Sequence, residues 1–140
     1  MAYQSYVLIC GGTACCSGGG DKIVKAFAQE LETAGLKDQV QVVTTGCLGF
    51  CEQGPIVKIL PQGTFYVQVK PEDVKEIVNE HLNKGRVVSR LCYDPAQAKK
   101  LVAESNIPFY QKQYRIVLRN CGIIDPEKIE DYIARDGYKA

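Results

Sequence analysis

Short apolar runs flank one amphipathic helical pattern in the first part of the chain. Residues 3–9 (YQSYVLI) are rich in aromatic and β-branched side chains, which is typical of a strand that ends at Cys10. From Asp21 to Gly35, apolar residues recur at helical spacing, with Asp21 placed to cap the helix and Gly35 placed to end it. Residues 39–44 (QVQVVT) predict a second strand. A strand–helix–strand order implies a right-handed crossover, so we expect these two strands to be parallel.

The next apolar runs predict an antiparallel addition to this pair. Residues 56–60 and 64–69 are separated only by a Pro-Gln-Gly turn, so we expect them to form a hairpin. Pro71, followed by apolar residues at helical spacing, predicts a second helix that ends at Gly85. The pattern therefore predicts an α/β fold in which residues 1–85 form a β-α-β-β-β-α unit with a mixed sheet.

Residues 86–140 carry a less regular pattern. Asp94 and the following proline predict the start of a short helix, which Ile107 and the proline after it are expected to stop. Residues 114–118 (YRIVL) indicate a strand or an extended arm. We therefore expect a C-terminal extension that is mainly helical.

A last helix is predicted after Asp125 and Pro126, and Gly137 is expected to end it. Its apolar residues Ile129, Tyr132 and Ile133 are expected to face inward. The sequence ends three residues after Gly137. This leads us to expect a fragment of a longer polypeptide, with part of the extension's apolar surface left exposed.

Composition and charge exclude several classes of function. The 140 residues suit one domain or one domain with an extension, and 46% apolar with 24% charged residues is ordinary for a globular protein. A formal net charge of +1 gives no electrostatic case for binding nucleic acid or an anionic membrane. No apolar segment approaches the ~20 residues that span a bilayer, and the N-terminus lacks the pattern of a signal peptide. We therefore expect a cytoplasmic protein with no nucleic-acid partner and no membrane span.

Seven cysteines give the sequence its candidate chemistry. Four of them form two pairs, Cys10-x4-Cys15 in CGGTACCSGGG and Cys47-x3-Cys51 in TGCLGFCEQGP. In the cytoplasm, thiols stay reduced, so clustered cysteines favour metal or redox chemistry over structural disulfides. Each pair follows one of the two parallel strands at its carboxyl end, where ligands bind in open α/β sheets. We therefore expect the four thiols to converge on one point.

Three chemistries remain open for such a convergence. Zinc is held by four cysteines in many structural sites, usually with ligands spaced by two to four residues. A [2Fe–2S] cluster is larger, needs two thiolates on each iron, and benefits from backbone N–H groups aimed at its sulfurs. The glycines in both motifs permit that close approach, and Thr13 and Thr45 are candidate hydroxyl donors. Dithiol redox chemistry would favour Cys-x-x-Cys, which the chain lacks.

The two cysteine motifs resemble those of the thioredoxin-like [2Fe–2S] ferredoxins. The resemblance is strongest to the version at the N-terminus of the NADH-binding flavoprotein subunits of NADH-dependent hydrogenases, formate dehydrogenases and complex I relatives. The later stretch QKQYRIVLRNCGIIDPEKIEDYIARDGY resembles the segment that opens the flavoprotein core of those subunits. The resemblance covers nearly the whole chain.

This resemblance implies a ligand set and a role. Cys10 and Cys15 would hold one iron of a [2Fe–2S] cluster, and Cys47 and Cys51 the other, although Cys16 adds a second thiol beside a ligand. Residues 1–85 would be the thioredoxin-like ferredoxin domain, with residues 86–140 forming a linker and the start of a flavoprotein core.

The resemblance also implies partners. FMN and NAD(P)H would bind only in the remainder of the parent subunit. The chain itself would be an electron carrier rather than an enzyme, working with the flavoprotein core and other iron–sulfur subunits of a multi-subunit hydrogenase or dehydrogenase. A four-cysteine zinc module with a structural or docking role is the alternative.

Three further residues favour plainer interpretations. Cys92 and Cys121 are each isolated in the sequence and are expected to be small buried apolar residues. His81 is expected to be a surface or half-buried residue of the second helix, and a single histidine excludes a Rieske-type centre. The pair Phe109–Tyr110 is expected to pack, or to form a docking surface.

Overall fold

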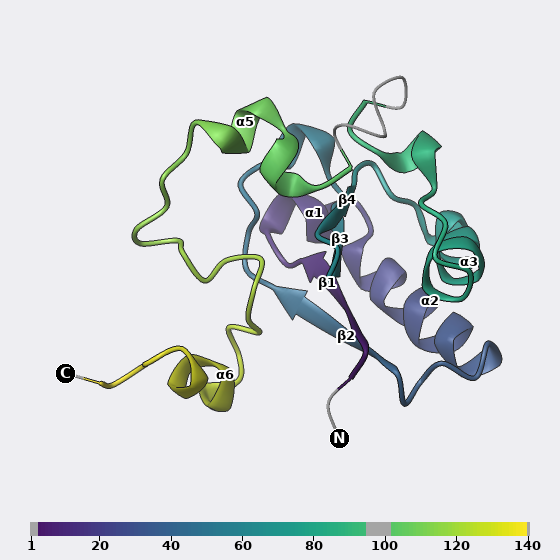
Figure 1. The fold of residues 1–140 in the computed structure, drawn as a ribbon, viewed down its shortest axis with the longest axis horizontal. Helices are drawn as coiled ribbons and strands as arrows, with labels where there is room; N and C mark the ends of the chain where they lie inside the picture. Colours follow the sequence, from purple (N-terminus) through teal and green to yellow (C-terminus); the bar gives the residue numbers. More distant parts are fainter. Residues whose placement is uncertain (1–2, 95–101, 140) are drawn as a thin grey trace.

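The computed structural model describes residues 3–94 and 102–139, and a four-stranded mixed sheet lies at its centre (Figure 1). The strands are β1 (Ser5–Cys10), β2 (Val40–Thr45), β3 (Val57–Leu60) and β4 (Thr64–Tyr66), in the spatial order β2-β1-β3-β4. β1 and β2 are parallel, whereas β3 is antiparallel to both β1 and β4. The predicted α/β unit with a mixed sheet is confirmed.

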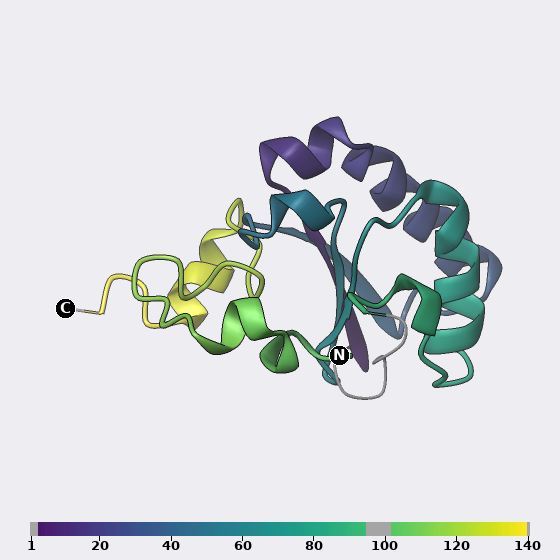
Figure 2. The same ribbon diagram turned by 90° about the horizontal axis from the view of Figure 1, so that it is seen from above.

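Two helical segments cover one face of this sheet (Figure 2). The first is α2 (Gly20–Thr33), whose buried residues Ile23, Phe27 and Leu31 recur at helical spacing. The second runs from a 3-10 turn at Pro71–Asp73 through α3 (Val74–Glu76) into wider π-helical turns at Ile77–Leu82. Both pack on the same side of β1, and burying each large apolar side chain there contributes about 1.5–3 kcal/mol.

Most of the extension, from residue 103 onward, lies over the opposite face (Figure 2). It contains a 3-10 turn at Glu104–Asn106, α5 (Pro108–Gln111) and α6 (Ile129–Ala134). Backbone bridges join it to β4, with Thr64 paired to Ala103 and Tyr66 paired to Cys92. A cavity of about 350 Å³ remains between the sheet and the end of the extension, lined by Tyr6, Leu8, Val43, Ile124, Lys128 and Ala134 among others.

Two local predictions for the first half of the chain need correction. The fourth strand ends at Tyr66 instead of residue 69, because Val67 N–H donates to Leu91 O and Val69 N–H donates to Pro55 O instead of to β3. The glycine-rich segment after β1 is not all loop, since it contains the short helix α1 (Thr13–Ser17).

The extension departs further from the predicted pattern. Pro108 begins α5 instead of ending a helix, because a proline at the first helical position has no N–H to leave unpaired. Most of the helix predicted after Asp94 falls on residues 95–101, outside the described residues. The segment 114–118 is irregular and forms no strand. The last helix begins at Ile129, after its predicted caps.

The apolar residues of the extension lie largely in solvent. Ile129, Tyr132 and Ile133 are 51%, 44% and 55% exposed, so their predicted inward orientation is wrong. Exposure continues along the arm before α6, at Tyr114, Ile116, Val117 and Leu118. The expectation of an exposed apolar surface is therefore confirmed. None of the helices in the described ranges has the length and apolar character needed to cross a membrane.

One buried polar pair fixes the second helical segment to the sheet. Tyr66 is fully buried, and its hydroxyl lies 2.7 Å from His81 Nδ1 and accepts a hydrogen bond from Val88 N–H at 3.1 Å. The Tyr66 hydroxyl and His81 Nδ1 share one hydrogen bond, and the imidazole tautomer decides which of them donates, because a hydroxyl oxygen can accept two hydrogen bonds. His81 is only 6% exposed, so its predicted position near the surface is wrong.

Removing the Tyr66 hydroxyl should destabilise the fold. Tyr66→Phe leaves His81 Nδ1 and Val88 N–H buried without a partner, which costs about 1–3 kcal/mol. The measurement is the free energy of unfolding from denaturant titration, with Tyr3→Phe as the control because Tyr3 is 38% exposed. A Tyr66→Phe protein as stable as the control would contradict this account.

The same pair predicts a pH dependence of stability. Burial lowers the pKa of His81 below its ordinary value near 6.5. The unfolded chain therefore takes up a proton at a pH where the folded chain does not, so stability is lost as pH falls below about 6.5. We expect a shallower fall between about pH 7.5 and pH 6 in His81→Gln than in the unchanged protein, by denaturant titration at each pH. Equal slopes would exclude His81 as the source.

Candidate metal centre

The pairing of β1 with β2 brings the two cysteine motifs to one end of the sheet. Cys10, the last residue of β1, pairs in parallel register with Thr45, the last residue of β2. The segments that follow β1 and β2 therefore leave the sheet in the same direction. Cys47 follows two residues beyond β2, and Cys51 begins a 3-10 turn at Cys51–Gln53.

The first motif folds back through α1 so that Cys15 returns to Cys10. Gly12 is the residue before α1, and Cys15 is the buried residue of this helix, 1% exposed. Cys16 lies on another side, half-buried, and its thiol donates to Gly11 O at 3.5 Å. The structure thus distinguishes the two neighbouring thiols and places Cys15, not Cys16, beside Cys10.

The four thiols interact with one another. Burial raises the pKa of the Cys15 thiol to about 12, and a side-chain hydrogen bond and charge repulsion with Cys10 add to this shift. Charge repulsion from Cys47 raises the pKa of the exposed Cys51 thiol. Such thiols resist becoming anions together unless positive charge lies between them, which is what a metal centre supplies.

Two glycines provide the space that such a centre needs. A Cβ atom at Gly12 would lie 3.0 Å from Cys47 Sγ and 3.5 Å from Cys10 Sγ. A Cβ atom at Gly54 would lie 2.8 Å from Cys15 Sγ. The backbone therefore approaches the sulfurs more closely than any other residue type would allow.

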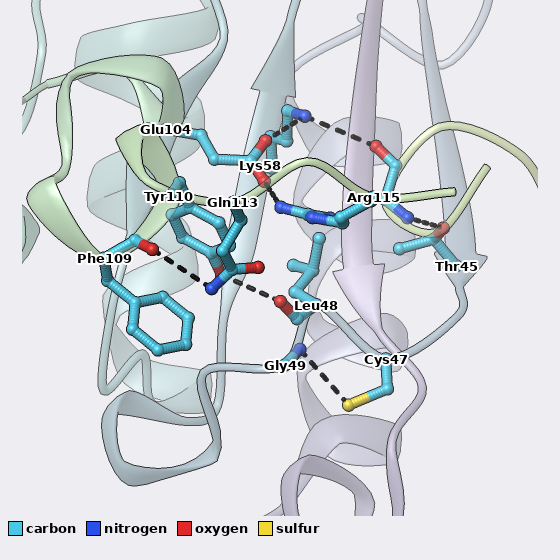
Figure 3. Close-up of polar contacts among 11 residues, drawn as sticks. Thr45, Cys47, Leu48, Gly49, Lys58, Glu104, Phe109, Tyr110, Gln113 and Arg115 are labelled. Atoms are coloured by element: carbon cyan, nitrogen blue, oxygen red, sulfur yellow. Dashed lines mark hydrogen bonds and ion pairs between the residues drawn. The ribbon is translucent and has the colours of Figure 1, made fainter. Parts of the chain in front are cut away.

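The donor set fits a [2Fe–2S] cluster. Two adjacent pairs of thiols match the requirement for two thiolates on each iron. Gly49 N–H donates to Cys47 Sγ at 3.3 Å, the kind of backbone contact that stabilises a negatively charged sulfur (Figure 3). Within residues 3–94 and 102–139, no three His, Cys, Asp or Glu side chains are arranged to hold a single metal ion.

The two pairs differ in their access to solvent. Cys10 and Cys15 are 2% and 1% exposed and belong to an apolar cluster with Leu48, Phe50 and other side chains. Cys47 and Cys51 are exposed. One side of the site is therefore dry, and the other side faces the surface.

The extension supplies neighbours that sequence patterns did not reveal. Cys121, predicted to be buried, is half-buried, and it lies near the site, because a Cβ atom at Gly46 would lie 3.1 Å from Cys121 Sγ. Thr45, expected as a donor to the cluster, instead donates its hydroxyl to Ile124 O. No local spacing signals such contacts between distant residues. Cys92, by contrast, is buried as predicted, and burial raises its pKa.

Comparison with known proteins identifies the family. The sequence profile of the thioredoxin-like [2Fe–2S] ferredoxins matches residues 3–82. A 2Fe-2S ferredoxin of Clostridium pasteurianum is 46% identical over 77 residues, which cover 55% of this chain and 76% of that protein. A 2Fe-2S ferredoxin of Aquifex aeolicus is 42% identical over 79 residues, covering 56% of this chain and 71% of that protein.

The solved structures agree with these matches. The crystal structure of the wild-type thioredoxin-like [2Fe–2S] ferredoxin from Aquifex aeolicus superposes with a TM-score of 0.60 at 35% identity. The match covers 66% of this chain and 99% of that chain. A shorter match is to the NADP-reducing hydrogenase subunit HndC of Solidesulfovibrio fructosivorans, which is 66% identical to this chain over 29 residues. These residues are 21% of this chain and 6% of that protein. The α/β fold with its mixed sheet is therefore thioredoxin-like, and the chain belongs to the thioredoxin-like [2Fe–2S] ferredoxins, electron carriers that hold a [2Fe–2S] cluster.

Proposed function

We propose that Cys10, Cys15, Cys47 and Cys51 ligate the cluster, and that the chain is the one-electron module of an NAD(P)H-dependent subunit in a multi-subunit hydrogenase or dehydrogenase. The observation that carries the ligand assignment is the convergence of these four thiols at the carboxyl ends of β1 and β2. When bound, the cluster takes up and releases single electrons.

The residues around the site have separate tasks in this proposal. Cys10 and Cys15 hold one iron in the dry interior, where the apolar cluster excludes water. Cys47 and Cys51 hold the other iron at the surface, where a donor or acceptor can come close. Gly49 N–H stabilises the charge on Cys47 Sγ.

The module role is supported by the extension and by the partial hydrogenase match. We assign residues 1–85 to the ferredoxin domain and residues 86–140 to a linker and the start of a flavoprotein core. The identity with HndC over 29 residues supports a role in a hydrogenase subunit. In such a subunit, FMN and NAD(P)H would be bound by the remainder of the parent subunit, and FMN would supply the conversion of a two-electron hydride into single electrons. The exposed apolar arm at residues 114–118 would provide a contact surface for that flavoprotein core.

The ligand assignment predicts a defined metal content. Anaerobically purified protein should contain about two irons and two acid-labile sulfides per chain and should be red-brown. The measurement combines iron, zinc and sulfide assays with the low-temperature EPR spectrum of the reduced protein. A colourless protein with a single tightly bound zinc would instead support a four-cysteine structural module.

Single substitutions should then separate ligands from other cysteines. Cys47→Ser removes a thiolate from the exposed pair, so the visible absorbance and iron content should fall to a small fraction of the unchanged protein. Cys92→Ser is the matched control, because Cys92 is buried beside Val88 O, outside the four-thiol site. Retention of a normal cluster in Cys47→Ser, or its loss in the control, would contradict the assignment.

The module role predicts transfer of electrons from a nicotinamide through a bound flavoprotein. The assembly purified with this chain should contain FMN, and NAD(P)H should reduce the [2Fe–2S] centre, as followed by EPR. Val117→Ser, which alters a side chain that is 92% exposed, should slow this reduction while leaving the spectrum of the isolated chain unchanged. The control is Tyr3→Ser, at the other end of the chain. An assembly without FMN would overturn the module role, and equal rates would exclude this surface.

A further inference from the structure

Thr45 is the last residue of β2, and its hydroxyl forms two hydrogen bonds with the backbone of the extension. The side chain is 1% exposed, donates to Ile124 O at 2.8 Å and accepts from Gly122 N–H at 2.9 Å. Both partners lie outside residues 3–82, the part that matches the ferredoxin family. A buried hydroxyl in the family domain thus depends on the extension for its hydrogen bonds.

The loop that follows Thr45 is held by the extension at two further points. Tyr110 donates its hydroxyl to Leu48 O at 2.9 Å (Figure 3). The Phe50 ring stacks on Phe109, with ring centroids 4.5 Å apart. Leu48 is 2% exposed and Phe50 is 9% exposed, so this side of the loop is covered along its length.

The backbone of the extension also packs directly against this loop. Gly122 has a φ of +77°, and a Cβ atom there would collide with Leu48 Cδ2, so the backbone itself packs on the loop. Glu104 forms ion pairs with Lys58 of β3 and, at 2.7 Å, with Arg115 of the extension (Figure 3). The Lys58 ammonium also donates to Gly122 O at 3.4 Å. These side chains are largely buried, so the ion pairs are better shielded from solvent than typical surface pairs.

We propose that residues 103–124 form a clamp on the loop at residues 46–50, and that Thr45 and Tyr110 are positioning residues that hold Cys47 and shield the cluster from water. The inference rests on the proposed ligand role of Cys47, which lies between the two clamped points, Thr45 and Leu48. A loop fixed on both sides of a ligand has few ways to move its sulfur, and Gly49 N–H stays aligned with it.

The clamp acts on the reduction potential through water. The reduced cluster carries one more negative charge than the oxidised cluster, and nearby water stabilises the more negative form. A loosened loop admits water, so the midpoint potential should rise. Iron should also become more accessible to a chelator.

The experiment compares Thr45→Val and Tyr110→Phe with the unchanged full-length protein. Each variant removes a hydroxyl with little change of shape. Thr45→Val leaves Gly122 N–H and Ile124 O without this partner, and Tyr110→Phe leaves Leu48 O without it. We expect iron release to a chelator to be about fivefold faster in each, which corresponds to the loss of roughly one hydrogen bond. The midpoint potential should shift to more positive values. Thr45→Ser, which keeps the hydroxyl, should restore both properties.

Matched controls remove the same groups elsewhere. Thr33→Val deletes a hydroxyl bonded to Gln29 O on the exposed side of α2, and Tyr3→Phe deletes a phenol oxygen far from the loop in sequence. Neither should change iron release or potential. Unchanged release and potential in both clamp variants would overturn the proposal, and so would equal changes in the controls.

A second measurement tests the clamp without the cluster. Hydrogen exchange of the amides at residues 46–49 in metal-free protein should be faster in Thr45→Val than in the unchanged chain and the Thr33→Val control. Equal exchange would overturn the clamp even if a variant failed to load iron. Failure of the unchanged protein to bind iron would instead overturn the ligand assignment, so the two failures are distinguishable.

Discussion

The parallel register of β1 with β2 is the constraint on which the site depends. Pairing of Cys10 with Thr45 places the ends of both strands together, and the chain turns from there into the two cysteine motifs. Register also fixes which way Cys10 faces. Val7 and Ile9 pack into the helix-covered core, while Cys10 joins the apolar cluster of Cys15 and Leu48. A slip of one residue would exchange these faces and bury an aliphatic side chain where the proposed ligand Cys10 lies.

A second constraint is that the site is completed from outside the ferredoxin domain. The apolar cluster that surrounds Cys10 and Cys15 includes Ile107 and Tyr110 from the extension. Buried thiolates are unfavourable in an apolar environment unless a cation and hydrogen bonds compensate. The extension makes that environment drier, and it also ties down the loop that bears Cys47. Its contribution is therefore to the surroundings of the four thiols that we propose as ligands.

The sequence was informative where structure follows local periodicity. The strands, α2 and the parallel crossover follow from apolar spacing over a few residues, so the meeting of the two cysteine motifs could be predicted. α1 could not be, because glycines usually break helices, and here they serve close approach to sulfur. The bond from Thr45 to Ile124 spans 79 positions and leaves no local pattern. The apolar residues of α6 were predicted to face inward because their spacing is amphipathic, but they are exposed. Periodicity does not reveal which surface, if any, covers an apolar face.

The uneven burial of the four thiols determines from which side a partner can approach the site. An electron exchanged with a partner is most easily delivered on the side where the chain interposes least material, and Cys47 and Cys51 are exposed there. The same exposed loop is the one that Thr45 and Tyr110 hold from behind. One face of the loop at residues 46–50 is therefore accessible to a partner, and the other face is held in place by the extension. The proposed redox centre can thus stay open on the side of Cys47 and Cys51 while the loop stays fixed, because the clamp restrains the loop through Thr45 and Leu48.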